Sequence, residues 1–155
     1  SYIELYKKIR NKLGENCSIT TDIIVGFPGE TKEDFNDTLE LAKECKYDSA
    51  FTFIYSPREG TPAAKMKDSI SLNVKEQRLQ RLNEIVNKYS NMNNQKYLNT
   101  VQKVLLVGES EKFKLYGYTE TQKLVNVKCD PSLLGQIVDV KITDAKSFSL
   151  DGEVE

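Results

Sequence analysis

The stretch that decides the fold is DIIVGFPGET at residues 22–31, with a companion, FTFIYSPREGTPAA, at residues 51–64. In the first, three β-branched residues run directly into Gly26, and Thr31 opens an amphipathic segment. In the second, an apolar run stops at Pro57, because the residue before a proline is restricted and the proline itself cannot continue the ladder. Each segment is a strand that ends in a loop, and the ligands of α/β proteins gather at such strand ends.

The segments around these strands predict helices. Residues 2–13 have apolar spacing typical of a helix, and Gly14 follows in the position of a C-cap glycine. Thr31 and Asp34 approximate a capping box for a second helix that ends near Cys45. The second helix is expected to bury one face, formed by Phe35, Leu39, Ala42 and Cys45.

Two strands and one long helix complete the first part of the chain. Residues 19–25 and 49–55 are expected to be strands, the first buried on both faces, as a parallel strand beneath helices is. A long helix is expected over residues 73–94, with Asn73 and Glu76 as capping residues and an asparagine-rich end that marks fraying or a linker. Two strands cannot close a barrel, so this part does not form a complete parallel barrel by itself.

The hydrophobic period changes near residue 97 from that of a helix to that of strands. Short alternating segments follow, among them VQKVLLV, KLVNV and QIVDVKI. The expected turns between strands lie at Gly108, Gly117, Pro131 and Gly135. The pattern predicts a small five-stranded, OB-like antiparallel barrel. The fold class is therefore α/β followed by all-β, with a partial (β/α) barrel of two strands and three helices before the small barrel.

Composition excludes several classes of protein. The 155 residues carry 22 basic and 23 acidic side chains and no histidine, which gives a net charge of −1. Lysines and carboxylates also nearly balance in the C-terminal part, so net charge gives RNA binding no support. No apolar run is long enough for a membrane span, and residues 1–13 lack the apolar core and cleavage site of a secretory signal, so we expect none. Cys17, Cys45 and Cys129 follow no disulfide or metal pattern, which predicts reduced thiols and a cytoplasmic protein.

Both opening segments and their spacing resemble the MiaB type of methylthiotransferase, a radical S-adenosylmethionine (SAM) family that places a methylthio group on an adenosine of tRNA. GYTETQKLVNV at residues 117–127 and LGQIVDVKITDAKSFSLDGEV at residues 134–154 are similar to the TRAM domain, the OB-like module that contacts RNA in this family. The resemblance covers nearly the whole chain. It implies the end of a radical SAM barrel in residues 1–94 and a TRAM domain in residues 95–155.

The resemblance also implies cofactors and partners. SAM and [4Fe–4S] clusters are the expected cofactors of the full-length enzyme, and tRNA is the expected partner of the TRAM domain. The cluster of the family is held by three cysteines spaced CxxxCxxC, which this sequence lacks. The chain is therefore expected to be a C-terminal fragment that is inactive alone, with no bound cofactor and no catalytic or metal-binding residues of its own. The missing N-terminal part is a further expected partner, and no membrane is.

An open barrel has its own consequence. A truncated barrel exposes strand edges and apolar helix faces, so residues 1–94 are expected to self-associate.

The SAM site of the family includes the ends of the two strands. The cofactor-binding candidates in this sequence are Asp22, Ile24, Gly26, Pro28, Tyr55 and Arg58. Ile24 would contact the adenine, while Gly26 and Pro28 would shape the adjoining turn. An acid such as Asp22 is costly in an apolar strand unless it is paired or faces a polar lumen, so a ligand and a structural partner both stay open. Arg58 suits the carboxylate of SAM, a tRNA phosphate or a local contact near Glu59.

Glu30 stands at the start of the second helix and is interpreted as a partner of the helix dipole rather than as a general base.

The RNA-binding candidates combine lysines, which follow phosphates, with tyrosines, which stack on bases. They are Lys103, Lys112, Lys114, Tyr116, Tyr118 and Lys123. Relatives usually carry a basic residue where this chain has Tyr118, which is either a stacking residue or a half-buried strand tyrosine. A solvated strand face would show the same pattern.

Two alternatives stay open at this point. The chain resembles, less closely, methylthiotransferases that act on threonylcarbamoyl-adenosine in tRNA or on a ribosomal protein. It is otherwise a stand-alone RNA-binding module with a helical appendage, although such a module has no use for two barrel strands that end in ligand-type loops.

Overall fold

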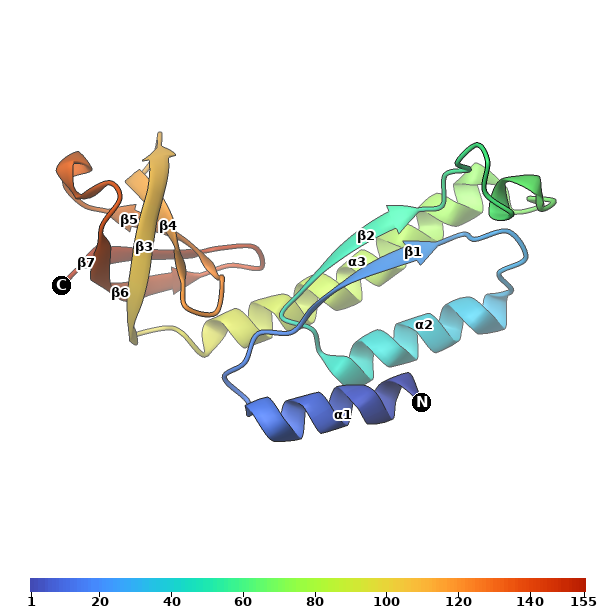
Figure 1. Cartoon of the computed structure of the whole chain (residues 1–155), viewed down its shortest axis with the longest axis horizontal. Coiled ribbons are helices and arrows are strands. Elements are labelled where there is room, and N and C mark those ends of the chain that lie inside the picture. Colours follow the sequence, from blue (N-terminus) through green and yellow to red (C-terminus); the bar gives the residue numbers. More distant parts are fainter. The chain divides into compact units, whose positions relative to one another are not determined.

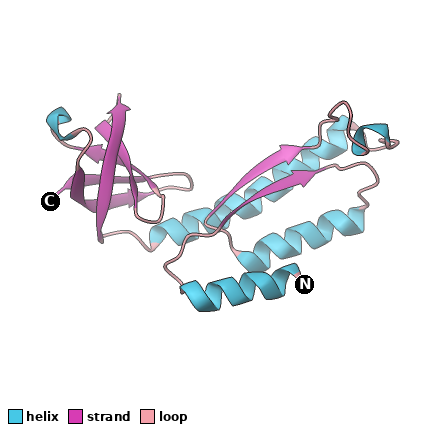
Figure 2. Cartoon of the chain, in the orientation of Figure 1, coloured by secondary structure: helices cyan, strands magenta, loops and turns pink.

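The computed structural model describes all residues, 1–155, and the chain divides into two compact units. The first unit contains Ser1–Ile9 and Ile19–Tyr89, and the second contains Arg10–Ser18 and Ser90–Glu155. Helices and parallel strands alternate along the first unit, whereas strands dominate the second (Figures 1 and 2). The predicted order, α/β followed by all-β, is confirmed.

The first unit is built around a parallel pair of strands. Its elements are α1 (Tyr2–Leu13), β1 (Thr20–Val25), α2 (Lys32–Cys45), β2 (Ser49–Ile54), the short 3-10 helix η1 (Ala63–Lys65) and α3 (Leu72–Gln95), of which α1 and α3 continue into the second unit. Strands β1 and β2 pair in parallel from Thr20 opposite Ser49 to Val25 opposite Ile54 (Figure 1). This is a βαβ connection, in which α2 links the two parallel strands.

The helix α2 confirms the capping prediction in detail. The Thr31 hydroxyl accepts a hydrogen bond from the Asp34 backbone N–H at 3.1 Å, and the Asp34 carboxylate accepts from the Thr31 N–H at 2.8 Å. The buried residues of α2 are the four that its periodicity predicts. They pack with Val25 from β1 and with Leu82 and Val86 from α3, except for Cys45, which is buried outside this cluster. Helices α2 and α3 therefore cover one face of the two-stranded sheet.

The opposite face of the sheet is open, so the expectation that β1 is buried on both faces is wrong. Side chains alternate between exposed and covered along β1. The exposed fractions of Ile24, Phe51 and Phe53 are 55%, 64% and 50%. The reason is that α2 and α3 supply one layer of helices and this unit has no second layer over the pair of strands.

Both ends of α3 differ from the prediction. The helix begins at Leu72, and the Ser71 hydroxyl accepts a 3.4 Å hydrogen bond from the Val74 N–H, so Ser71 caps the helix instead of Asn73. The asparagine-rich end neither frays nor forms a linker. Asn94 is 3% exposed, and its amide donates to the Lys146 carbonyl at 2.7 Å. Asparagine favours helix ends, where Asn94 lies, and its tertiary hydrogen bond holds that end of the helix in place.

The second unit contains the predicted five-stranded barrel. Its strands are β3 (Val101–Ser110), β4 (Lys114–Thr119), β5 (Leu124–Lys128), β6 (Ile137–Ala145) and β7 (Leu150–Val154), with the 3-10 helix η2 (Pro131–Leu133) between β5 and β6. The barrel closes in the order β3-β4-β5-β7-β6. One pair, β5 with β7, is parallel, which corrects the expectation of an all-antiparallel barrel. An odd number of strands in a closed ring cannot alternate in direction at every pair.

Two of the four expected turn residues lie inside strands. Gly117 faces the interior of the barrel, where a Cβ atom would lie 2.1 Å from the Leu105 carbonyl oxygen. Gly108 lies beneath the ring of Tyr116, and a Cβ atom on Gly108 would lie 2.5 Å from the nearest ring carbon. Both glycines permit close approach of a neighbouring strand or ring rather than a reversal of the chain. Pro131 and Gly135 lie in the connection between β5 and β6, as predicted.

Candidate nucleic-acid interface and strand-end site

The carboxyl ends of β1 and β2 form a tightly packed corner. Gly26 has a φ of +72°, and a Cβ atom there would lie 2.6 Å from the Lys75 side chain, so only glycine fits. The ring of Phe27 meets the ring of Tyr55 edge to face, with 5.0 Å between centroids. The Tyr55 N–H donates to the Val25 carbonyl at 2.9 Å, which extends the ladder by one residue beyond β2.

A buried ion pair fixes the turn after β1. Both carboxylate oxygens of Glu30 lie 3.1 Å from the Gly26 N–H, and one of them pairs with the guanidinium of Arg78 from α3. The two side chains are only 11% and 12% exposed. Arg78 also donates to the Glu30 carbonyl at 3.1 Å. Glu30 therefore holds the turn and α3 together, and the interpretation of Glu30 as a partner of the helix dipole is wrong because its carboxylate faces Gly26 and Arg78.

A second ion pair lies beside the first. Lys75, 6% exposed, pairs with Asp68, and its ammonium lies 5.8 Å from the centre of the Tyr55 ring. Hydrogen bonds from the Lys75 ammonium and from the Ile70 N–H lower the pKa of Asp68 below its ordinary value. The hydroxyl of Tyr55 is buried and has no hydrogen-bond partner, which is unusual for a buried polar atom. The corner therefore has one unsatisfied polar atom.

The predicted cofactor residues are only partly brought together. Ile24, Gly26 and Tyr55 lie at the strand ends, and Pro28 is buried in the turn that follows β1. Asp22 lies earlier on β1, on the open face and opposite Phe51, where its carboxylate is exposed and has no ion-pair partner. The Arg58 side chain is exposed in the connection after β2 and forms no hydrogen bond or ion pair with another side chain.

Sequence reasoning missed Lys75 and Arg78, although a signal was present. Both lie on the same helical stripe as the buried residues Leu82 and Val86, at spacings of three, four and four. Charged residues on an otherwise apolar stripe are buried at a cost and are therefore expected to be paired.

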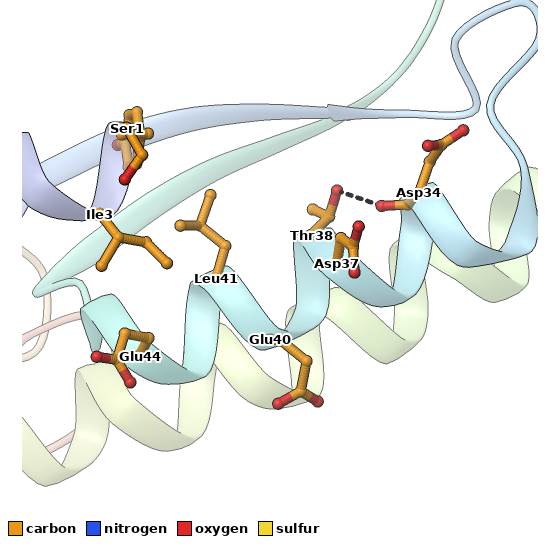
Figure 3. Close-up of a pocket in the computed structure, with 9 residues that line it drawn as sticks. Ser1, Ile3, Asp34, Asp37, Thr38, Glu40, Leu41 and Glu44 are labelled. Atoms are coloured by element: carbon orange, nitrogen blue, oxygen red, sulfur yellow. Dashed lines mark hydrogen bonds between the residues drawn. The ribbon is translucent and has the colours of Figure 1, made fainter.

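An acidic groove lies between α1 and α2 (Figure 3). Its lining comprises Ser1, Tyr2, Ile3, Asp34, Asp37, Thr38, Glu40, Leu41 and Glu44. Three of its four carboxylates already have partners: Asp34 holds the helix cap, Glu40 pairs with Lys43 at 2.7 Å, and Glu44 pairs with Lys7 at 2.8 Å. The groove therefore lacks a set of carboxylates available for a ligand.

The outer face of β4 and β5 carries the candidate nucleic-acid interface. Along β4 the outward residues are Lys114, Tyr116 and Tyr118, while Leu115 and Gly117 point inward. Lys128 of β5 lies directly opposite Lys114 in the ladder. Both lysines are exposed and neither has an ion-pair partner. Like charges placed directly opposite destabilise a sheet; Glu153 of β7, opposite Lys128 on the other side of β5, offsets part of this repulsion, and an anion between the two lysines would relieve the rest.

The backbone of Lys114 adds to this argument. Its φ is +87°, in the left-handed region that favours glycine. Lysine at this position costs stability of about 1–2 kcal/mol. Strained residues of this kind cluster at functional sites, which supports a role for the Lys114 side chain.

The remaining RNA-binding candidates differ in availability. Tyr118 is 38% exposed, and its ring meets that of Tyr116 edge to face at 6.4 Å. Lys112 lies in the connection before β4, with its ammonium 5.0 Å from the Phe113 ring. Lys103 lies on β3 and pairs with Asp139 at 3.1 Å, and Lys123 is only 8% exposed. Lys128 was missed because its position opposite Lys114 depends on strand register, which the sequence does not show.

The three cysteines form neither a disulfide nor part of a group of metal ligands. Cys17, Cys45 and Cys129 are free thiols, and burial raises the pKa of Cys45 and Cys129. No three side chains of the metal-ligating types His, Cys, Asp and Glu are grouped so that they could hold a metal ion. No helix combines the length and the apolar character that a membrane crossing requires.

Comparisons with known proteins find relatives of the whole chain and one family match within it. Residues 95–154 match the TRAM domain family. The whole chain is 57% identical over 155 residues to a tRNA-2-methylthio-N(6)-dimethylallyladenosine synthase of Bacillus cytotoxicus. It is 54% identical to proteins of the same name from Bacillus mycoides and Bacillus thuringiensis. Over nearly its whole length the chain is therefore similar to these tRNA-modifying synthases, and its residues 95–154 match the TRAM domain.

Each of these alignments covers 99% of this chain and 30% of the relative. The chain thus spans about a third of the length of the curated methylthiotransferases that it matches. The family resemblance drawn from the two strand-end segments is confirmed.

Proposed function

We propose that this chain is the C-terminal part of a cytoplasmic tRNA methylthiotransferase, like the synthases that it resembles, and that its barrel holds the tRNA. In this proposal residues 95–155 are the RNA-binding TRAM domain, and residues 1–94 supply the end of a radical SAM barrel. The single observation that carries the proposal is the pair of unpartnered lysines, Lys114 and Lys128, beside two tyrosines on the β4–β5 face.

The position of this face supports RNA as the ligand. The barrel has the strand order of an OB-fold, in which β4 and β5 are the second and third strands. OB-folds bind oligonucleotides on that face. Lysines that have no acidic partner are available to phosphates, and exposed tyrosines are available to bases. The overall net charge of −1 does not oppose this because the positive charge is local.

A second part of the proposal concerns SAM. The strand-end corner fits a ligand with an apolar ring, because Ile24 exposes its side chain beside it and the buried Tyr55 hydroxyl lacks a partner. Asp22, Gly26, Pro28 and Arg58 complete the expected cofactor-binding set. When bound with a [4Fe–4S] cluster, SAM supplies the radical chemistry that activates an adenosine carbon. The residues of this chain bind and orient the cofactor.

The residues of this chain do not fit the cluster itself. Its three cysteines are not grouped with one another or with other ligands. No step of the reaction is therefore assigned to them, and we expect the chain alone to transfer no methylthio group to tRNA.

The test of RNA binding uses a substitution that separates function from folding. Lys114→Gly removes the ammonium and also the left-handed strain, so it should stabilise the barrel by about 1 kcal/mol. It should nevertheless weaken the binding of unmodified tRNA. Titrations at several salt concentrations should show that the slope of log K against log salt falls by about 1 for Lys114→Gly and by about 2 when Lys128→Ala is added.

Lys43→Ala is the matched control, because Lys43 is an exposed lysine on α2 that is already paired with Glu40. It should leave both the affinity and the salt slope unchanged. Wild-type protein that fails to bind tRNA at low salt, or a Lys114→Gly variant that binds as tightly as the wild type, would contradict the proposal.

A further inference from the structure

Phe148 is the most exposed of the large apolar side chains of this chain, with 73% of its surface accessible. It lies in the connection between β6 and β7, a segment of four residues from 146 to 149. A phenylalanine that is this exposed contributes little to the barrel core, whose apolar residues are completely buried. Packing of the barrel core therefore does not account for a phenylalanine at this position.

The connection that carries Phe148 is held firmly in place. Three polar side chains from the end of α3 donate hydrogen bonds to three successive carbonyls, those of Ala145, Lys146 and Ser147. The donors are Gln95 at 2.9 Å, Asn94 at 2.7 Å and Ser90 at 2.5 Å. The Lys146 N–H also donates to the Ser149 carbonyl at 2.8 Å, which closes the turn. The aromatic ring is thus displayed on an ordered backbone, so a partner would not have to order the loop.

A second aromatic residue, Phe113, contacts this connection from the neighbouring one between β3 and β4. Phe113 lies in the connection between β3 and β4, and its ring centre is 5.9 Å from the Lys146 ammonium and 5.0 Å from the Lys112 ammonium. Lys146 is already committed, because it pairs with Asp151 and lies 3.9 Å from Asp144. The hydrogen bond to Asp151 raises the pKa of Lys146, so it stays charged.

Lys112 is the cation in this cluster without an acidic partner. Its connection, which also carries the exposed Glu111, leads directly into Lys114, so two lysines without acidic partners lie two residues apart in the chain. The two connections correspond to the loops between the first and second strands and between the fourth and fifth strands of an OB-fold, which flank its oligonucleotide-binding face. An exposed ring in one of these loops and a lysine without an acidic partner in the other suit a nucleic-acid base and a phosphate better than an apolar protein surface.

We propose that Phe148 stacks on an unpaired base of the RNA, while Lys112 contacts a neighbouring phosphate. The inference rests on the proposed RNA-binding function of the β4–β5 face and extends the interface to the loop at residues 146–149. Stacking is indifferent to the identity of the base, so Phe148 adds affinity without reading the sequence.

The test compares Phe148→Ala, Phe148→Leu and Phe148→Trp in the whole chain. The probes are unmodified tRNA and a short single-stranded RNA that contains one 2-aminopurine, whose fluorescence falls when it stacks. Loss of stacking on one base corresponds to a loss of affinity of about fivefold to hundredfold. Phe148→Ala and Phe148→Leu should show that loss together with loss of quenching, whereas Phe148→Trp should retain both.

The salt dependence separates this inference from the function on which it rests. Phe148 contacts no phosphate, so its variants should keep the salt slope of the wild type, unlike the Lys114 and Lys128 variants. Wild-type binding that Phe148→Ala leaves unchanged would overturn the stacking inference alone, and would assign the exposed ring to a protein contact. Full affinity in Phe148→Leu would also overturn it, because leucine cannot stack. A wild-type chain that binds neither RNA would overturn both proposals.

Discussion

The sheets of the two units differ in that one is closed and the other is open. The barrel closes on itself, so its strands leave no unpaired edge, and its interior residues such as Leu106 and Val140 are completely buried. The α/β unit has only two strands, and one face of this pair exposes Ile24, Phe51 and Phe53. A closed sheet pairs all its strand edges and buries its apolar side chains within itself. The open sheet needs a ligand or another part of a protein to cover its apolar face and its strand edges. In our proposal that covering consists of SAM and the rest of the radical SAM barrel.

The largest expected effect comes from a cavity in the closed sheet. Leu106→Ala should destabilise the barrel by about 2–5 kcal/mol, because the packed interior cannot collapse around the lost atoms. Phe51→Ala, on the open face, should cost less than about 1 kcal/mol in the same chain. Hydrogen exchange of the strand amides measures both opening free energies. Equal losses of opening free energy for Leu106→Ala and Phe51→Ala would contradict the proposed difference between the closed and the open sheet.

The next effect concerns the buried ion pair of the α/β unit. Arg78→Ala should destabilise this unit by about 3 kcal/mol, because it leaves Glu30 buried without its cation. Arg81→Ala is the matched control, since the guanidinium groups of Arg78 and Arg81 lie 5.5 Å and 5.4 Å from the Phe35 ring. Urea denaturation followed by the helical circular dichroism signal should show a clear loss for Arg78→Ala. A loss of the same size in Arg81→Ala would instead assign the effect to the aromatic contact.

A third prediction concerns the open face itself. The isolated chain should self-associate at high concentration, because three large apolar side chains share this face. Replacing Phe51 and Phe53 by lysine should return it to a monomer by light scattering, without unfolding α2 or α3. Leu72→Lys is a suitable control, because Leu72 is 63% exposed but belongs to α3, which covers the other face of the sheet. A monomeric wild type at high concentration would count against this use of the face.

The smallest effect concerns the helix cap. Thr31→Ala should destabilise the α/β unit by about 1 kcal/mol at neutral pH and leave barrel protection unchanged. Hydrogen bonds from the Thr31 N–H and hydroxyl lower the pKa of Asp34 below its ordinary value of 3.8. These bonds therefore stabilise the folded unit fully at pH values above 3.8. This stabilisation is lost as the pH falls through the lowered pKa. The difference between wild type and Thr31→Ala in thermal unfolding should therefore shrink toward pH 3, and a constant difference would argue against the capping box.

Local signals made much of the fold predictable from the sequence. The capping box at Thr31, the buried stripe of α2 and the change of period near residue 97 all depend on residues that are close in the chain. Gly117 was misassigned because its purpose is the approach of Leu105 from a neighbouring strand, and no local pattern records that contact.

The candidate sites were less predictable for the same reason. The Glu30–Arg78 pair joins residues 48 positions apart, and the Lys114–Lys128 pair depends on the register of β4 and β5. Phe148 was overlooked because its exposure and its anchored loop depend on hydrogen bonds from α3. The cofactor-binding set came from the family resemblance, and it stays a prediction.

The most direct test of the account is hydrogen exchange of the whole chain with and without saturating unmodified tRNA. We predict added protection in β4, β5 and the connections at residues 111–113 and 146–149, and no change in β1 and β2. Protection confined to β1 and β2, with none on the barrel, would contradict the claim that the closed sheet holds the RNA while the open sheet awaits the cofactor and the rest of its barrel.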